Sequence, residues 1–152
     1  MSDYRVTTMG LDELALAIDW AAAEGWNPGL DDATSFLAAD PRGFLLGVLD
    51  GEPIASISVV RYGESFGFLG LYIVKPEHRG KGYGWRLWNA GLEHLADRTV
   101  GLDGVVAQQD NYRRSGFDFA YRDVRYRGRG TGEAIADAGL VPLAAVPFDE
   151  LL

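Results

Sequence analysis

The sequence predicts a mixed α/β (α+β) fold: a mostly antiparallel sheet with helices on both faces. Two helical patterns open the chain, and three strand patterns then follow one another directly. In the middle of the chain a strand, a glycine-rich turn and a helix follow in immediate succession. With 152 residues and 47% apolar content, the chain suits one domain with a short tail. We expect the domain over residues 1–130, with a linker and a C-terminal strand over 131–152.

The first elements are helical. Apolar residues at helical spacing predict a helix over about 10–23, with acidic residues in its first turn, where they favour the helix dipole. Two glycines and a proline predict a loop over residues 25–29. A short second helix, capped by Asp31 or Asp32, ends before Asp40-Pro41.

Strands follow the helices. Apolar runs over Gly43–Leu49 and Pro53–Tyr62 flank Asp50-Gly51, which is a hairpin signal. The segment Phe66–Val74 is apolar on both faces, as expected for a central strand that is covered on both sides. These three segments predict an antiparallel meander.

The second half of the domain alternates helices and strands. After Gly84 an amphipathic helix is predicted to run to about Asp97, followed by a short strand over Val100–Asp103. Residues 108–115 predict a short helix, and the alternation over Phe117–Arg127 predicts a further strand.

Composition excludes several classes of function. The chain has no cysteine, so disulfides, thiolate nucleophiles and cysteine metal sites are excluded, and we expect no metal. Its apolar runs are too short to span a bilayer, and its first residues lack the layout of a signal peptide, so we expect a cytoplasmic protein without a membrane partner. A net charge of −8 argues against nucleic acid as a partner.

The charge is unevenly distributed. Residues 1–70 carry eleven acids and three arginines, a net −8, whereas residues 71–130 carry eleven bases and seven acids, a net +4. The only two lysines, Lys75 and Lys81, lie in this basic middle. A basic segment in an acidic protein suits a small polyanion such as a nucleotide cofactor.

The basic middle holds the most informative motif. A strand ends at Val74, a turn with Gly80 and Gly82 follows, and a helix begins at once. Glycines allow backbone amides to approach a phosphate closely, and a helix N-terminus adds unpaired N–H groups. The motif therefore predicts a cradle for a pyrophosphate.

Three kinds of phosphate cradle have to be distinguished. A P-loop requires Ser or Thr after its Gly-Lys pair, but Gly82 follows Lys81. A Rossmann fingerprint requires a different glycine spacing inside an early βαβ unit. The third pattern, Arg/Gln-x-x-Gly-x-Gly/Ala, is matched by Arg79, Gly82 and Gly84. This pattern is typical of GNAT N-acetyltransferases, and the chain resembles that superfamily over about residues 3–127.

The resemblance implies the GNAT fold, whose sheet splays between its fourth and fifth strands, and acetyl-CoA (coenzyme A) as the cofactor. Pantetheine would lie in the splay beside Ile73 and Val74, whose backbone amides would polarise the thioester carbonyl. The residues that the resemblance assigns to the cofactor are Ile73, Val74, Lys75, Arg79, Gly80, Lys81, Gly82, Tyr83 and Gly84.

A second signature concerns catalysis. Tyr112 to Phe117 match the family's Tyr-x-x-x-Gly-Phe pattern, which implies that Tyr112 is the general acid that protonates the departing thiolate. The alternative is an ordinary aromatic residue of a helix. Val105 and Phe68 stand where many members carry asparagine and glutamate, so the general base is open. Asp103 is the tentative base, with Glu24 and Glu64 as further candidates.

The resemblance further implies direct attack of a primary amine, from a small molecule or a peptide, on the thioester. The acidic first half suits a cationic amine, and Glu24, Trp26 and Asn27 are the predicted substrate residues. Trp26 either lines this pocket or plugs the core. We also consider a homodimer, a non-catalytic acyl-CoA-binding module and, more remotely, a dinucleotide-binding enzyme.

Several short sequence segments, such as Glu24–Gly29 and Gly67–Gly70, resemble those of one subgroup, the YitH-like acetyltransferases. Members of that subgroup carry a second, C-terminal half. Residues 146–152 resemble the opening of that half, so the resemblance implies that 131–152 is a linker and the truncated start of a second half; the alternative is a naturally short member.

Overall fold

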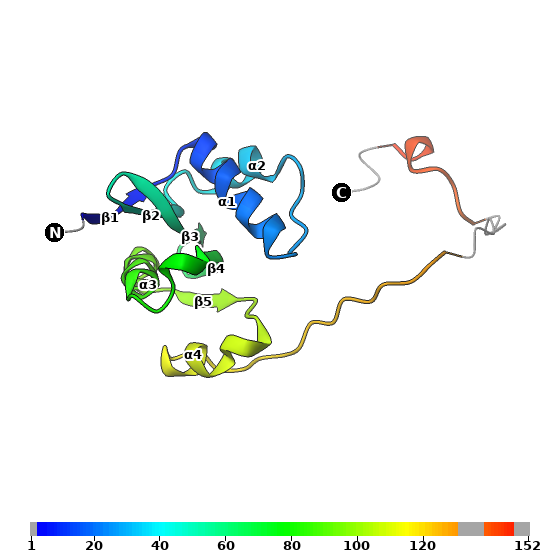
Figure 1. Ribbon diagram of the computed structural model, residues 1–152. Coiled ribbons are helices and arrows are strands. Elements are labelled where there is room, and N and C mark those ends of the chain that lie inside the picture. The colour runs from blue at the N-terminus through cyan, green and yellow to red at the C-terminus, as the bar shows by residue number, and fades with distance from the viewer. Residues whose placement is uncertain (1–2, 131–138, 148–152) are drawn as a thin grey trace.

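The computed structural model describes residues 3–130 and 139–147. Its centre is a five-stranded sheet in the order β1-β2-β3-β4-β5 (Figure 1). The first four strands pair antiparallel, and β5 pairs parallel to β4. The strands are β1 (Tyr4–Thr8), β2 (Phe44–Leu49), β3 (Glu52–Tyr62), β4 (Phe66–Val74) and β5 (Thr99–Leu102).

Helices cover both faces of the sheet, as Figure 1 shows. The helices α1 (Leu11–Ala23) and α2 (Asp32–Ala39) lie on one face, where Leu14 packs against Phe44 and Leu46 of β2. The helix α3 (Tyr83–His94) covers the other face. Strand residues alternate between the two cores, as the pleat of a sheet requires.

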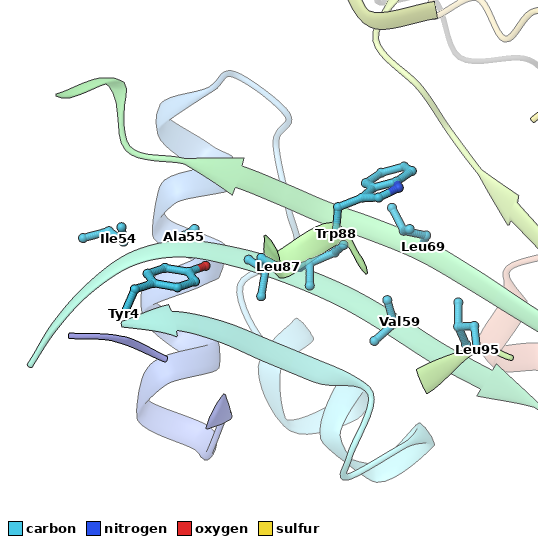
Figure 2. Packing of buried hydrophobic residues seen from close by; sticks show 9 residues of the cluster. Tyr4, Ile54, Ala55, Val59, Leu69, Leu87, Trp88 and Leu95 are labelled. Atoms are coloured by element: carbon cyan, nitrogen blue, oxygen red, sulfur yellow. The ribbon is translucent and has the colours of Figure 1, made fainter. Parts of the chain in front are cut away.

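An apolar core beneath α3 fixes the position of this helix, whose N-terminus borders the candidate site. Leu87 and Trp88 of α3 lie over Val59 of β3 and Leu69 of β4, and Figure 2 shows these side chains with their neighbours. All four are nearly inaccessible to solvent. The helix and the strand that flank the glycine-rich turn are therefore held by one continuous apolar core.

Beyond β5 the chain forms two 3₁₀ turns, Val106–Gln108 and Leu143–Ala145, and the short helix α4 (Gln109–Arg114). A further 3₁₀ turn, Pro76–His78, precedes α3. None of the described helices is long and apolar enough to cross a membrane. The predicted linker and C-terminal strand fall mainly on residues 131–138 and 148–152, which lie outside the described residues.

The predicted mixed fold, the meander and the order of the helices are confirmed. The strand predicted over Phe117–Arg127 is wrong, because residues 117–130 form neither helix nor strand. Alternation is a local signal, whereas a strand also needs a paired neighbour. Conversely, β1 was not predicted, and it is held in the sheet by its pairing with β2.

The end of β4 departs from regular sheet geometry. A bulge places Leu71 at φ 46° and shifts the register with β3, and the Ser56 hydroxyl donates a hydrogen bond to the Leu71 carbonyl (2.8 Å). The pairing of β4 with β5 ends at Leu69 and Leu102. The last five residues of β4 therefore have no pairing with β5, as the predicted splay between these strands requires.

Candidate active site

The motif predicted to hold a pyrophosphate forms a loop between β4 and α3, here called the glycine loop (Lys75–Gly82). The Lys75 amide still donates to the Ile54 carbonyl of β3 (2.9 Å), so the loop leaves the sheet from a fixed position. A 3₁₀ turn over Pro76–His78 follows. Gly82 then acts as the N-cap of α3 in the left-handed conformation (φ 83°).

The loop presents free backbone donors. The amides of Gly80, Lys81 and Gly82 donate no hydrogen bond within the part of the chain that the structure describes. A Cβ atom at Gly80 or Gly82 would meet nothing within 4 Å, so their surroundings are open. The first amides of α3 also lack partners inside the helix. This arrangement of open glycines and a helix N-terminus fits a phosphate group.

Gly84, the last glycine of the motif, serves a different purpose. A Cβ atom there would lie 2.7 Å from the Tyr72 hydroxyl oxygen and 2.8 Å from the Val74 Cγ2 atom. Gly84 therefore allows the first turn of α3 to pack closely on β4. It positions the loop through packing.

The cations around the loop face different partners. Lys81 is exposed and makes no ion pair among the described residues, so its ammonium group is free for an anion. Arg79 instead points its guanidinium at the Val74 carbonyl and at Glu24. The Lys75 ammonium lies 5.2 Å from the centre of the Trp20 ring.

Tyr83, also predicted to bind the cofactor, is held by β1. Its ring stacks on Tyr4 with 4.9 Å between ring centres, and its carbonyl accepts a hydrogen bond from the Tyr4 hydroxyl (3.0 Å). Arg86 lies over the Tyr4 ring and donates to the Tyr4 carbonyl. The strand β1 thus anchors the first turn of α3.

Tyr112 lies on α4 and packs against the body of the domain. Its ring stacks on Trp88 with 6.0 Å between ring centres, and its hydroxyl oxygen accepts a hydrogen bond from the Val105 backbone. Burial raises the pKa of Tyr112 above its usual value of 10.0, and the hydrogen bond from Val105 opposes the shift. The hydroxyl therefore stays protonated at neutral pH and can donate a proton.

Asp103 and Tyr112 line the same pocket, which has a volume of about 420 Å³. The pocket runs along β5 and α4, and residues 117–123 also line it. Phe68 lines it too, at the position where the family pattern given above has glutamate in many members. Asp103 is exposed, so its carboxylate is accessible to a ligand in this pocket.

The predicted substrate residues lie on the loop between α1 and α2, here called the Trp26 loop (Glu24–Gly29). Trp26 is half-buried, and its backbone amide closes the end of α1 by donating to the Ala21 carbonyl (3.0 Å). Asn27 is exposed, with φ 52°. None of the three substrate residues lines the pocket that holds Tyr112.

Two aromatic residues near the site were not predicted as part of it. Tyr72 of β4 and Trp88 of α3 lie with 5.2 Å between ring centres, and Trp88 also supports Tyr112. Burial, with Tyr4 and Tyr112 nearby, raises the pKa of Tyr72 to about 12. The Trp88 indole nitrogen is buried without a hydrogen-bond partner in the described structure. In the sequence, only the spacing of apolar residues along α3 indicated that Trp88 faces the core.

Comparisons with known proteins agree with this geometry. The family model described as "Acetyltransferase (GNAT) family" matches residues 11–117. A holothin acyltransferase from Pseudoalteromonas sp. is 39% identical over 93% of this chain and 48% of its own length. The chain spans at most about half the length of the curated relatives that it matches.

Solved structures share the fold. An acetyltransferase assigned to the GNAT family from Xanthomonas campestris superposes with a TM-score of 0.66 and 24% identity, covering 82% of this chain and 94% of its own. A predicted acetyltransferase from Clostridium acetobutylicum, solved with acetyl-CoA, has a TM-score of 0.60 and 13% identity, covering 84% and 96%. GNAT acetyltransferases use acetyl-CoA, and the glycine loop fits its pyrophosphate. On the family match, this chain belongs to the acetyltransferase (GNAT) family.

Proposed function

We propose that this protein transfers an acetyl group from acetyl-CoA to a primary amine by direct attack of the amine on the thioester. The observation that carries the proposal is the glycine loop, whose unpaired amides and open glycines lead directly into the N-terminus of α3. Acetyl-CoA, when bound, supplies an activated acetyl group as a thioester. The chain itself has to hold the phosphates, orient the acyl group and move two protons.

The end of β4, which is not paired with β5, supports the predicted position of pantetheine. Because β5 pairs with β4 only as far as Leu69, the backbone of Ile73 and Val74 has no β5 neighbour. Those backbone groups are suited to bond an extended ligand as a neighbouring strand would. The Val74 carbonyl is already engaged by Arg79, which leaves its second lone pair and the neighbouring amides for such a ligand.

Two groups are assigned to proton transfer. Tyr112 is the proposed general acid, since its hydroxyl keeps its proton at neutral pH. Asp103 is the proposed base, because it is exposed and lines the same pocket as Tyr112. Glu24 is a weaker candidate, because its carboxylate already pairs with Arg79. Glu64 lies in the turn between β3 and β4, at the end of the sheet away from the glycine loop.

The acceptor is proposed to be an amine of a small molecule or of a peptide. The relative named above acts on holothin by its name, so holothin belongs in a screen with polyamines, amino acids and peptide N-termini. We also propose membership of the YitH-like subgroup, which the similarity to relatives about twice as long supports.

One observation favours a second candidate, a non-catalytic acyl-CoA-binding module. Phe68 places an aromatic ring in the pocket where a carboxylate would have acted as base. Such a module would bind acetyl-CoA without turning it over in any screen of amines. Release of free CoA, followed with a thiol reagent across the screen, distinguishes the module from the enzyme.

The proposal is tested by thermal unfolding with acetyl-CoA. A ligand present at 100 times its Kd and bound only to the folded state adds about 2.7 kcal/mol, which raises Tm by roughly 5–10 °C for a chain of this size. Gly82→Val should abolish this shift, because the new side chain enters the open space of the glycine loop.

Gly63→Val is the matched control. Gly63 also has positive φ (58°) and open surroundings, but it lies in the turn between β3 and β4. Both variants lose stability from backbone strain, and only Gly82→Val should lose the response to acetyl-CoA. If wild type shows no shift, or if Gly82→Val shifts as wild type does, the glycine loop is not the acetyl-CoA site.

A further inference from the structure

The last turn of α1 is joined directly to the glycine loop. The Arg79 Nη2 atom lies 2.6 Å from the Glu24 carboxylate, and the Arg79 Nε atom donates to the Val74 carbonyl at 2.7 Å. One guanidinium group therefore contacts both the end of β4 and the C-cap of α1. We call this contact the Glu24–Arg79 bridge.

A second contact joins the same two parts of the molecule. Lys75, the first residue of the glycine loop, places its ammonium over the ring of Trp20, one turn before Glu24. The Glu24 amide donates to the Trp20 carbonyl (3.0 Å), so the two contacts on α1 are joined through its backbone. The end of the helix is thus held at both the entry and the middle of the glycine loop.

The Trp26 loop begins where this attachment ends. Glu24 is its first residue, and Gly25 (φ 80°) and Asn27 (φ 52°) turn the chain away from the helix. The only described hydrogen bond that a side chain makes to a backbone amide of this loop is from Gly29 to Asp32 (2.7 Å). Among the hydrogen bonds and ion pairs of the described residues, the bridge is the one that ties this loop to the glycine loop.

We propose that the Glu24–Arg79 bridge couples the glycine loop to the Trp26 loop, which holds the predicted substrate residues, so that coenzyme A in the glycine loop restrains the Trp26 loop. This inference rests on the proposed function and assigns Glu24 and Arg79 as positioning residues. Coenzyme A holds the glycine loop, Arg79 is thereby fixed against Val74, and Glu24 is fixed in turn. Coupling of this kind is reciprocal, so an acceptor that orders the Trp26 loop also strengthens donor binding.

The geometry requires arginine at this position. A guanidinium group has a planar fork of donors that can engage the Val74 carbonyl and the Glu24 carboxylate together. A lysine ammonium keeps the charge but lacks that fork. Both side chains of the bridge are partly exposed, at 50% and 38%, so the coupling is modest and screened by salt.

The test is hydrogen–deuterium exchange of the whole chain with saturating coenzyme A and no acceptor. In wild type, coenzyme A should slow exchange in peptides over residues 79–87 and also, by about two- to five-fold, in peptides over residues 20–31; that range follows from the free energy of a half-exposed ion pair. In Glu24→Gln, the first protection should remain and the second should be lost. Arg79→Lys should lose the second protection as well.

Asp19→Asn is the matched control, since Asp19 is an exposed acid of the same helix that makes no ion pair among the described residues. It removes the same charge and should behave as wild type does. The proposal is overturned if the Trp26 loop stays protected in Glu24→Gln, or if it never responds in wild type while the glycine loop does. Absence of protection in the wild-type glycine loop would overturn the proposed function as well.

Discussion

The packing of Gly84 leads to a prediction that separates two explanations for a glycine in this motif. We expect Gly84→Ala to destabilise the fold while coenzyme A binding by the folded protein stays within a few-fold of wild type. The new methyl group would lie 2.7 Å from the Tyr72 hydroxyl oxygen and 2.8 Å from Val74. Ordinary contacts begin at 3.4 Å, so helix and strand must separate by about 0.7 Å.

The expected loss of stability in Gly84→Ala is the difference between two opposing effects. Alanine favours a helix over glycine by up to about 1 kcal/mol, whereas overpacking a filled core costs about 1–3 kcal/mol. Tyr72 cannot withdraw easily, because it packs against Trp88 with 5.2 Å between ring centres. We therefore expect a net loss of about 1 kcal/mol, which lowers Tm by roughly 2–5 °C.

The assay is thermal unfolding followed by circular dichroism, with calorimetric titration of coenzyme A at a temperature where both proteins are folded. Gly91→Ala is the matched variant, because Gly91 lies on the same helix, about two turns after Gly84, and its methyl group would lie 2.8 Å from Val59 of β3. It should lose stability to a similar degree. If Gly84→Ala is as stable as wild type but binds coenzyme A much more weakly, Gly84 acts on the phosphates and the packing argument is refuted.

Three further predictions concern the acid, the pH dependence and the Trp26 loop. Tyr112→Phe should lower turnover by roughly 10²–10⁴-fold with little change in the Kd of coenzyme A, and turnover within a few-fold of wild type would assign protonation to water. Burial lowers the pKa of His94 in the folded protein, so His94 binds a proton more readily in the unfolded chain. The free energy of unfolding should therefore fall as pH drops below about 6.5. Urea unfolding at pH 7 and at pH 5 should show a smaller loss of this free energy in His94→Gln than in wild type. Trp26→Ala should raise the KM of the acceptor if Trp26 lines a pocket, whereas a large fall in Tm with the same KM would make it a core plug.

The pH prediction rests on a cluster at the far end of α3. Burial alone would raise the pKa of Asp40, but backbone amides of Arg61 and Arg42 and the ring of His94 outweigh it and lower that pKa. Asp40 therefore stabilises the fold above its usual pKa of 3.8 and loses that contribution as pH falls further. Its effect has the same sign as that of His94, in a lower range of pH, so the measurement at pH 5 reports His94.

Much of this fold was predictable because its strongest signals are local. The strand β4, the glycine loop and α3 follow one another within one continuous segment, so their motif could be read without knowing any distant contact. The hairpin at Asp50-Gly51 is local as well. Elements that depend on a distant neighbour were harder to predict. The strand β1 is in the sheet because β2 pairs with it, whereas no described strand pairs with residues 117–127 despite their alternation.

In the candidate site, too, some roles could be predicted from local sequence and others depend on distant contacts. Gly80 and Gly82 could be assigned to a phosphate cradle because their conformational freedom is a property of the residue itself. The role of Gly84 could not, since it depends on where Tyr72 points.

The ion pair of Glu24 and Arg79 is the clearest case of a contact that the sequence did not predict. The two residues are 55 positions apart. The glycine-rich motif predicted a phosphate ligand for Arg79, and the acidic first half of the chain predicted an amine ligand for Glu24. Charge and residue type show that a side chain can bind an ion, but only the fold decides which ion is within reach. In this chain each of them reaches the other, and for that reason mutations at either position should first be tested for an effect on the opposite binding site.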